Sequence, residues 1–251
     1  MVCYAFVDDT DVIQAACDVT QNGEAVVPQM QRSVDRWEGG LRATGGALVP
    51  AKSHWYLIDF VWTGKLWRYR TSDEMPGELS ILDTMGQRVT LERHEPSEAT
   101  EILGVWQAMD GNNTKQIAQL RQKTEDFADS MRTGYLSKND AWYAINTTIM
   151  KSLEYPMMTT TISEREWNFI LRPVLETGLP QAGINKKFPR AVVHGPLRFQ
   201  GLNIRHPYVT QELIHLHTIL NHGSQNTITG DLIRATLEQL VLELGLGGHP
   251  L

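Results

Sequence analysis

The sequence has little cysteine and no long apolar run, and both absences exclude classes of protein. Only Cys3 and Cys17 occur in 251 residues, too few for a disulfide framework or a cysteine-based zinc site. No stretch approaches the ~20 apolar residues of a membrane-spanning helix, so no membrane association is expected. The N-terminus has no secretory signal pattern. We therefore expect reduced thiols in an intracellular protein, cytoplasmic or nuclear.

Basic residues are also fewer than acidic residues. The chain has 23 Lys and Arg against 29 Asp and Glu, a net charge of -6. Domains that bind nucleic acid through bulk charge are usually basic, so such binding would need a local strip of cations. Residues 179–211 are the one such window, because they contain no acidic residue and are rich in Pro and Gly. Its cations are Lys186, Lys187, Arg190, Arg198 and Arg205. The window is expected to be a structured loop, either simply solvated or contacting phosphates.

What the sequence does contain at its start is an apolar run that ends in acids. Residues 2–7 are followed by Asp8 and Asp9, and Asp11 comes two positions later. β-Branched and aromatic residues favour a strand, whereas Asp favours a turn. Neighbouring side chains of an extended chain point to opposite faces, so Asp8 and Asp9 can share a site only in a tight hairpin. Two close carboxylates repel unless a cation lies between them, and their oxygens suit Mg²⁺ or Mn²⁺. An ordinary acidic surface turn is the alternative, and Asp11 is expected in a turn or a helix cap.

Strands and turns are predicted up to about residue 112. An amphipathic helix over 23–46 is ended by Gly45 and Gly46. A strand over 55–62 has apolar residues on both faces and is expected to be covered on both sides. Further hairpins and strands are expected at 63–69, at 79–91 around Met85-Gly86, and at 102–106. The core is expected to hold Trp37, Trp55, Trp62, Trp67 and Trp106, and the alternative is that these rings serve as platforms on which bases stack.

Helices are predicted for the rest of the chain. Their apolar residues recur at helical spacing, and Ser163 with Glu166 forms a capping-box pattern. The expected helices cover 113–132, 138–153, 163–178, 209–220 and 229–245. The fold class predicted is therefore α+β, with a boundary near Asp110.

Several short motifs follow one another in an order that is typical of one protein family. Phe6-Val7-Asp8-Asp9 precedes an amphipathic helix, a glycine-terminated turn leads to Lys52, and a hairpin precedes Leu103-Gly104. This order resembles the second half of the palm of reverse transcriptases, especially those of retrotransposons, with their paired-aspartate, lysine and Leu-Gly primer-grip motifs. Residues 188–204 are similar to sequence that follows the thumb in retroelement polymerases. The resemblance implies an incomplete palm over 1–112 and a helical thumb-like or connection-like region over 113–251, which contains the basic loop 179–211.

The resemblance also implies an activity and a set of site residues. The activity is RNA-directed DNA synthesis from deoxynucleoside triphosphates on an RNA or DNA template with a primer, using two Mg²⁺ or Mn²⁺ ions. Asp8 would be the stronger metal ligand and Asp9 the second. Lys52 would stabilise charge on the incoming triphosphate or protonate pyrophosphate, and the alternative for it is an ordinary exposed lysine. The residues implied at the primer are Phe6, Leu103 and Gly104.

The family pattern needs a third carboxylate on an earlier strand, and fingers that hold the nucleotide. The chain begins seven residues before Asp8, and no substitute is evident downstream, so we expect the isolated chain to be inactive. A second hypothesis is a non-catalytic nucleic-acid-binding relic that uses 179–211 and the helical tail. A phosphotransferase using Asp9-Thr10-Asp11 is disfavoured, because Ile13 stands where that motif has Thr or Val and no βαβ series follows.

Overall fold

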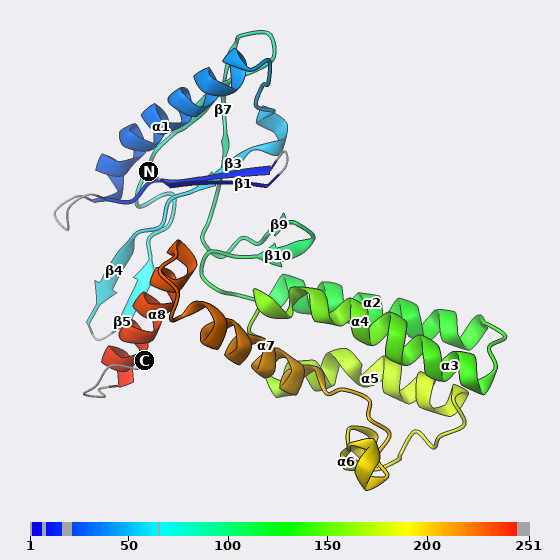
Figure 1. Cartoon of the computed structure of the whole chain (residues 1–251). Helices are drawn as coiled ribbons and strands as arrows, with labels where there is room; N and C mark the ends of the chain where they lie inside the picture. The colour runs from blue at the N-terminus through cyan, green and yellow to red at the C-terminus, as the bar shows by residue number, and fades with distance from the viewer. Residues whose placement is uncertain (1, 7–8, 17–21, 65, 245–251) are drawn as a thin grey trace. The chain divides into compact units, whose positions relative to one another are not determined.

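The computed structural model describes residues 2–6, 9–16, 22–64 and 66–244 (Figure 1). The chain divides into two compact units. The first comprises Met1–Ile102 and Trp106–Asn112, and the second comprises Leu103–Val105 and Asn113–Leu251. The first unit holds one long helix and most of the strands, and the second is mainly helical. The predicted α+β class is confirmed.

The described strands pair two by two. The antiparallel hairpins are β1 (Val2–Phe6) with β2 (Asp9–Ile13), β4 (Phe60–Thr63) with β5 (Leu66–Tyr69), and β6 (Ser80–Leu82) with β7 (Arg88–Thr90). The other pairs are β3 (His54–Tyr56) with β8 (Glu92–His94), which is parallel, and β9 (Thr100–Ile102) with β10 (Val105–Gln107). The hairpins predicted at 63–69 and 79–91 are confirmed.

The continuous strand predicted over 55–62 is wrong. Strand β3 ends at Tyr56 and β4 begins at Phe60. Between them the Asp59 carboxylate accepts a hydrogen bond from the Phe60 N–H at 2.8 Å, a local bond that competes with strand pairing. Trp55 is buried as expected, but Trp62 is 69% exposed. The expectation that Trp62 and Trp67 lie in the core is therefore also wrong, since Trp67 is 51% exposed.

Helix α1 (Gly23–Ala43) carries the core of the first unit. The Asn22 side chain caps its start by accepting from the Ala25 N–H, and Gly45 follows its end with a φ of 86°, a conformation open to glycine. Its apolar stripe packs on buried side chains of the loops and strands. The core residues are Val34, Trp55, Leu57, Met75, Leu79, Ile81 and Leu91.

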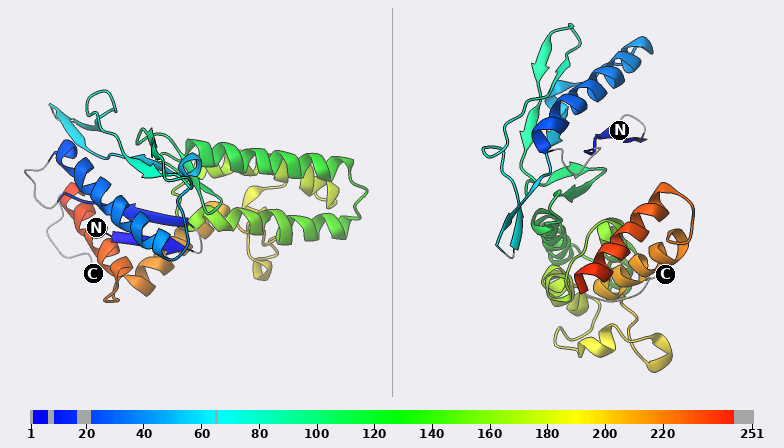
Figure 2. Two further views of the ribbon diagram at one scale, coloured as in Figure 1. Left: turned by 90° about the horizontal axis from the view of Figure 1, so that it is seen from above. Right: turned by 90° about the vertical axis from the view of Figure 1, so that its left-hand side faces the viewer.

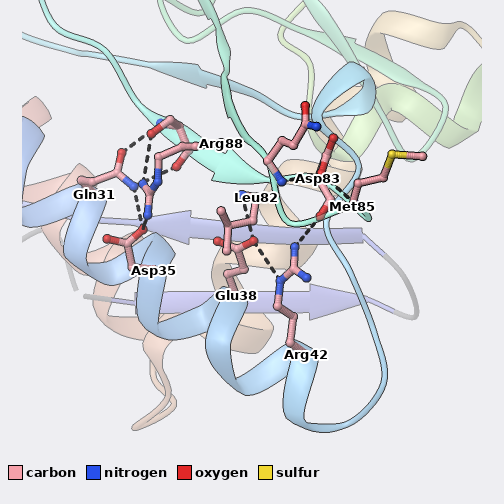
Figure 3. Close-up of polar contacts among 10 residues, drawn as sticks. Gln31, Asp35, Glu38, Arg42, Leu82, Asp83, Met85 and Arg88 are labelled. Carbon is pink, nitrogen blue, oxygen red and sulfur yellow. Dashed lines mark hydrogen bonds and ion pairs between the residues drawn. The ribbon is translucent and has the colours of Figure 1, made fainter.

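A row of polar contacts joins α1 to the β6–β7 hairpin, which lies along it (Figure 2). The Gln31 amide exchanges two hydrogen bonds with the backbone of Ser80, at 2.8 and 2.9 Å. Glu38, 2% exposed, accepts from the Leu82 N–H at 2.9 Å and pairs with Arg42 at 3.3 Å. Figure 3 shows these side chains pointing from the helix toward the hairpin. Because the Glu38 carboxylate has both an N–H and a guanidinium as partners, the helix can bury it there at little cost.

The second unit consists of helices and short helical turns. In chain order they are α2 (Thr114–Thr133), α3 (Lys138–Ala144), the π-helical turn η2 (Ile145–Ile149), α4 (Met150–Glu154), the 3₁₀ turn η3 (Tyr155–Met158), α5 (Glu164–Gln181), α6 (Arg190–Val193), the 3₁₀ turn η4 (Leu197–Phe199), α7 (Pro207–His222) and α8 (Ile228–Leu244). All five predicted helices are present. The capping box of Ser163 and Glu166 forms at the start of α5 as predicted.

The helical core centres on α5. This helix packs along α2 and also contacts α3 and α7 (Figure 1). Trp167 and Ile170 are fully buried, and Leu153 and Met157 reach the same cluster from the preceding turns. Val193 and Ile204, from the basic segment, are also fully buried in it. The core therefore anchors residues 179–211 from beneath.

Candidate nucleic-acid interface

The acidic hairpin predicted at the start of the chain is present in its backbone. Strands β1 and β2 pair antiparallel with Phe6 opposite Asp9. Residues 7–8 link the two strands, so Asp8 lies outside the described residues. For Phe6 and Asp9 the structure describes the backbone. The hairpin expected from the acidic turn is confirmed, and its metal-binding role stays a prediction.

Carboxylate oxygens are the donors that Mg²⁺ and Mn²⁺ prefer, so Asp8 and Asp9 fit such an ion in their chemistry. Among the side chains that the structure describes, no group of three or more His, Cys, Asp or Glu could hold a metal ion. The described residues therefore do not form a complete metal site. Two adjacent carboxylates would need a further ligand.

Asp11 lies within strand β2 opposite Tyr4, so the expected turn or capping role is wrong. Its exposed carboxylate acts on His54, whose ring stacks on His94 with 4.9 Å between centroids. Partial burial lowers the pKa of His54, and His94 lowers that pKa further, while Asp11 opposes both. The Tyr56 ring packs edge-on against His54 at 5.6 Å. These rings form an aromatic cluster next to the segment that carries Lys52.

Lys52 ends the 3₁₀ turn η1 (Pro50–Lys52), and its side chain is exposed. Pro50 begins this turn, as its fixed φ favours. None of the ion pairs between described residues involves Lys52. Its side chain is thus exposed to solvent, and its role at an incoming triphosphate stays a prediction.

Leu103 and Gly104 do not lie in a strand, which corrects the predicted strand over 102–106. They form the turn between β9 and β10, with φ of 50° and 79°. This turn groups with the second unit, where the Tyr155 hydroxyl donates to the Leu103 carbonyl oxygen at 2.7 Å. Gly104 permits the left-handed conformation that the turn needs. A role under a primer backbone stays a prediction.

The cations of the basic segment 179–211 lie on its outside. Lys186, Lys187, Arg190 and Arg198 are exposed and belong to none of the ion pairs between described residues. Arg205 is also exposed but pairs with Glu154 at 3.4 Å. Four of the five predicted cations therefore have no carboxylate partner among the described residues and can contact phosphates. Arg205 would first have to break its ion pair with Glu154.

An aromatic side chain accompanies these cations and was missed by the sequence reasoning. Phe199 is 71% exposed in η4, and the Arg198 guanidinium lies 4.7 Å from its ring centroid. Exposed aromatic rings beside cations are a common feature of surfaces that bind nucleic acid. In the sequence, the adjacent residues Arg198 and Phe199 could have indicated this pairing of a cation with an aromatic ring.

Two histidines hold the segment together beneath these cations. The ring centroids of His194 and His206 lie 4.7 Å apart, and His194 Nδ1 lies 2.8 Å from the Ile204 carbonyl oxygen. Burial lowers the pKa of both imidazoles. At His194 the hydrogen bond with the Ile204 backbone raises the pKa and Arg190 lowers it. At His206 the neighbouring His194 lowers the pKa and Glu164 raises it. The pair is therefore neutral at pH 7, and the positive charge of the segment comes from Lys and Arg.

The predicted site residues are divided between the two units. Phe6, Asp9 and Lys52 belong to the first, while Leu103, Gly104 and the basic segment belong to the second. No known protein family, curated protein or solved structure matches this chain. Within the described residues, no helix is long and apolar enough to span a membrane.

Proposed function

We propose that the chain is part of a retroelement RNA-directed DNA polymerase. One observation carries the proposal: the antiparallel β1–β2 hairpin, in which Asp8 falls in the two-residue link and Asp9 begins the return strand. Helix α1, the exposed Lys52 and further hairpins follow in the order that the reverse-transcriptase palm predicts. A tight hairpin brings neighbouring carboxylates to one tip, which an extended strand cannot do.

In this proposal, Asp8 and Asp9 hold the ions from the hairpin tip. Bound divalent ions would activate the primer 3′-oxygen and stabilise the leaving pyrophosphate. Phe6 contacts the primer end, and Lys52 offers its exposed ammonium group to the triphosphate. The described side chains supply no cluster of three metal-binding groups, so we expect catalysis to need a further carboxylate.

Primer extension tests this proposal. The purified chain, given a labelled primer on an RNA or DNA template with deoxynucleoside triphosphates and Mg²⁺, is expected to add no nucleotides. Supplying the fingers and upstream palm strand of a retroelement polymerase in frame should restore addition. Asp8→Asn should then abolish it, while Asp73→Asn, at an exposed acid elsewhere in the first unit, should not. Equal extension by the Asp8→Asn protein would contradict the proposal.

A second candidate is a non-catalytic nucleic-acid-binding protein, and a different observation favours it. Four cations of the basic segment are exposed and free of carboxylates among the described residues, and a packed core fixes the segment from beneath. A fixed array of cations binds phosphates at a smaller entropic cost than a mobile one. Binding here would not depend on the acidic hairpin.

Fluorescence anisotropy with a labelled primer–template duplex tests the second candidate. Charge reversal at Lys186, Lys187 and Arg190 should weaken binding and flatten its salt dependence, because fewer counterions are then released. Asp8→Ala and Asp9→Ala should leave the affinity unchanged. Reversal of Lys115, Lys123 and Arg132 on α2 is the control for net charge. If both triple variants bind alike, the basic segment has no special role.

A further inference from the structure

The β4–β5 hairpin carries four aromatic residues on one face. In its register Phe60 lies opposite Tyr69, and Trp62 lies opposite Trp67. Side chains of directly opposed residues share a face, as do residues two apart in one strand. The rings of Phe60, Trp67 and Tyr69 pack mutually at centroid distances of 5.2–5.4 Å. We call these four residues the aromatic face.

This aromatic face is not buried in the core of its unit. Phe60 is 50% exposed, Trp62 69% and Trp67 51%, and none of them belongs to the described apolar core of the first unit. A two-stranded hairpin without a covering layer is marginal in water. Large exposed aromatic surfaces usually mark a binding site, so the aromatic face is expected to have a partner.

The hairpin itself contains no acidic residue, so its charges do not oppose an anionic partner. Residues 60–70 contain Lys65, Arg68 and Arg70 and no acid, in a chain of net charge -6. Arg68 lies opposite Val61 and thus on the other face, where it binds Glu74 through two hydrogen bonds and lowers the pKa of that carboxyl to about 2. Arg70 pairs with Asp59 at 3.5 Å. The acidic partners of Arg68 and Arg70 therefore lie outside residues 60–70. The aromatic face itself contains no acidic residue.

The exposed area argues against a second copy of the chain as the partner. The exposed parts of Phe60, Trp62 and Trp67 come to roughly 400 Å² if each ring offers ~200 Å² or slightly more. A stable dimer needs about 800 Å² from each partner. Stacking of unpaired bases needs no such area, because each base contacts one ring, and it tolerates any sequence.

We propose that the aromatic face binds unpaired nucleobases of a single-stranded polynucleotide by stacking, with Trp62 and Trp67 as the main platforms. This site does not rest on the metal hairpin or on the basic segment, and it holds whether or not the chain takes part in polymerisation.

Anisotropy with labelled 20-nucleotide oligomers of dT and rU tests the proposal on the full chain. The paired substitutions Trp62→Ala and Trp67→Ala should weaken binding of both oligomers at least 10-fold, since stacking contributes appreciably per base. The variant carrying Trp62→Phe and Trp67→Phe should retain most of the affinity and shows that loss is not due to misfolding. Tyr143→Ala, which removes a ring that is 69% exposed on α3, is the matched control and should bind like the parent.

Two further arms separate stacking from other causes. An abasic oligomer of the same length should bind the parent and the double alanine variant equally, because it has phosphates but no bases. A blunt duplex should also bind the parent and the double alanine variant equally.

The proposal is overturned if the alanine variant loses affinity equally for the abasic oligomer, or if single-strand binding does not change. It is also overturned if the parent forms a concentration-dependent dimer that the alanine variant abolishes.

Discussion

Gln211 of α7 accepts a hydrogen bond from the indole Nε1 of Trp167 on α5 at 3.0 Å, and both side chains are fully buried. The same Gln211 amide accepts from the Ile162 N–H at 3.1 Å and donates to the Ile162 carbonyl oxygen at 3.0 Å. One polar side chain thus satisfies an indole and both backbone groups of a third residue. It fixes α7, and with it the end of the basic segment, to the start of α5.

Gln211→Leu should destabilise the helical unit by about 2–4 kcal/mol, because it leaves three buried polar groups without partners. Gln122→Leu is the control, since Gln122 is exposed and bonds only to Asp126 among the described residues. Urea unfolding monitored by helical circular dichroism measures both changes. Equal stability of the two variants would show that the Gln211 network contributes little.

Glu38→Ala should loosen the β6–β7 hairpin from α1. The substitution removes the acceptor of the Leu82 N–H and the ion-pair partner of Arg42, at an expected cost of about 2–3 kcal/mol. Amide hydrogen exchange should therefore speed up at Leu82. Glu101→Ala, at an exposed residue, should leave that rate unchanged. Unaltered exchange at Leu82 in the Glu38→Ala protein would contradict the role of this contact.

The basic segment should lose stability as the pH falls below 6.5. Burial lowers the pKa of His194 and His206 from the ordinary value of 6.5, so the unfolded state binds more protons below that pH. The stabilisation is complete above pH 6.5 and declines toward the lower pKa of the folded state. At His194 the hydrogen bond with the Ile204 backbone opposes the lowering of the pKa and Arg190 reinforces it. At His206 the neighbouring His194 reinforces the lowering of the pKa and Glu164 opposes it. NMR titration of the two imidazoles checks this, and a pKa above 6.5 for both would refute it.

Gly201→Ala should distort the basic segment without changing its charge. A Cβ at Gly201 would lie 2.0 Å from the Gly195 carbonyl oxygen, so the backbone must move apart. Binding to a primer–template duplex should weaken several-fold if the cations act as a fixed array. Gly40→Ala is the control, because a Cβ there meets no atom within 4 Å. Unchanged binding by the Gly201→Ala protein would mean that the array need not be fixed.

Features specified by neighbouring residues could be predicted from the sequence. Ser163 and Glu166 are three positions apart, and each bonds to the backbone and side chain of the other across the helix start. Gly64 and Gly86 likewise take positive φ in the hairpin turns where they were expected. Such signals are local and survive in any context.

Features that depend on residues far away in the sequence could not be predicted from the sequence. Trp62 looked like a core residue from its type, but its burial depends on what packs against β4. The parallel pairing of His54 with Glu92 joins segments 38 positions apart, and Gln211 is buried because its partners lie 44 to 49 positions away. Leu103 was assigned to a strand because it is apolar, although its φ of 50° belongs to a turn. The order of the sequence motifs predicted the candidate site. Phe199 and the aromatic face were recognised only from the exposed fractions of their side chains in the structure.

The proposed polymerase function requires Asp8 and Asp9 to bind a divalent metal ion. Paramagnetic Mn²⁺ tests it directly, because it broadens NMR signals of nearby amides even when binding is weak. Titration into the isotope-labelled chain should broaden amides of β1 and β2 next to residues 7–9 first. That broadening should vanish in the Asp8→Asn protein and persist in the Asp73→Asn protein. Broadening that is absent from the hairpin, or that is the same in both variants, would contradict the account.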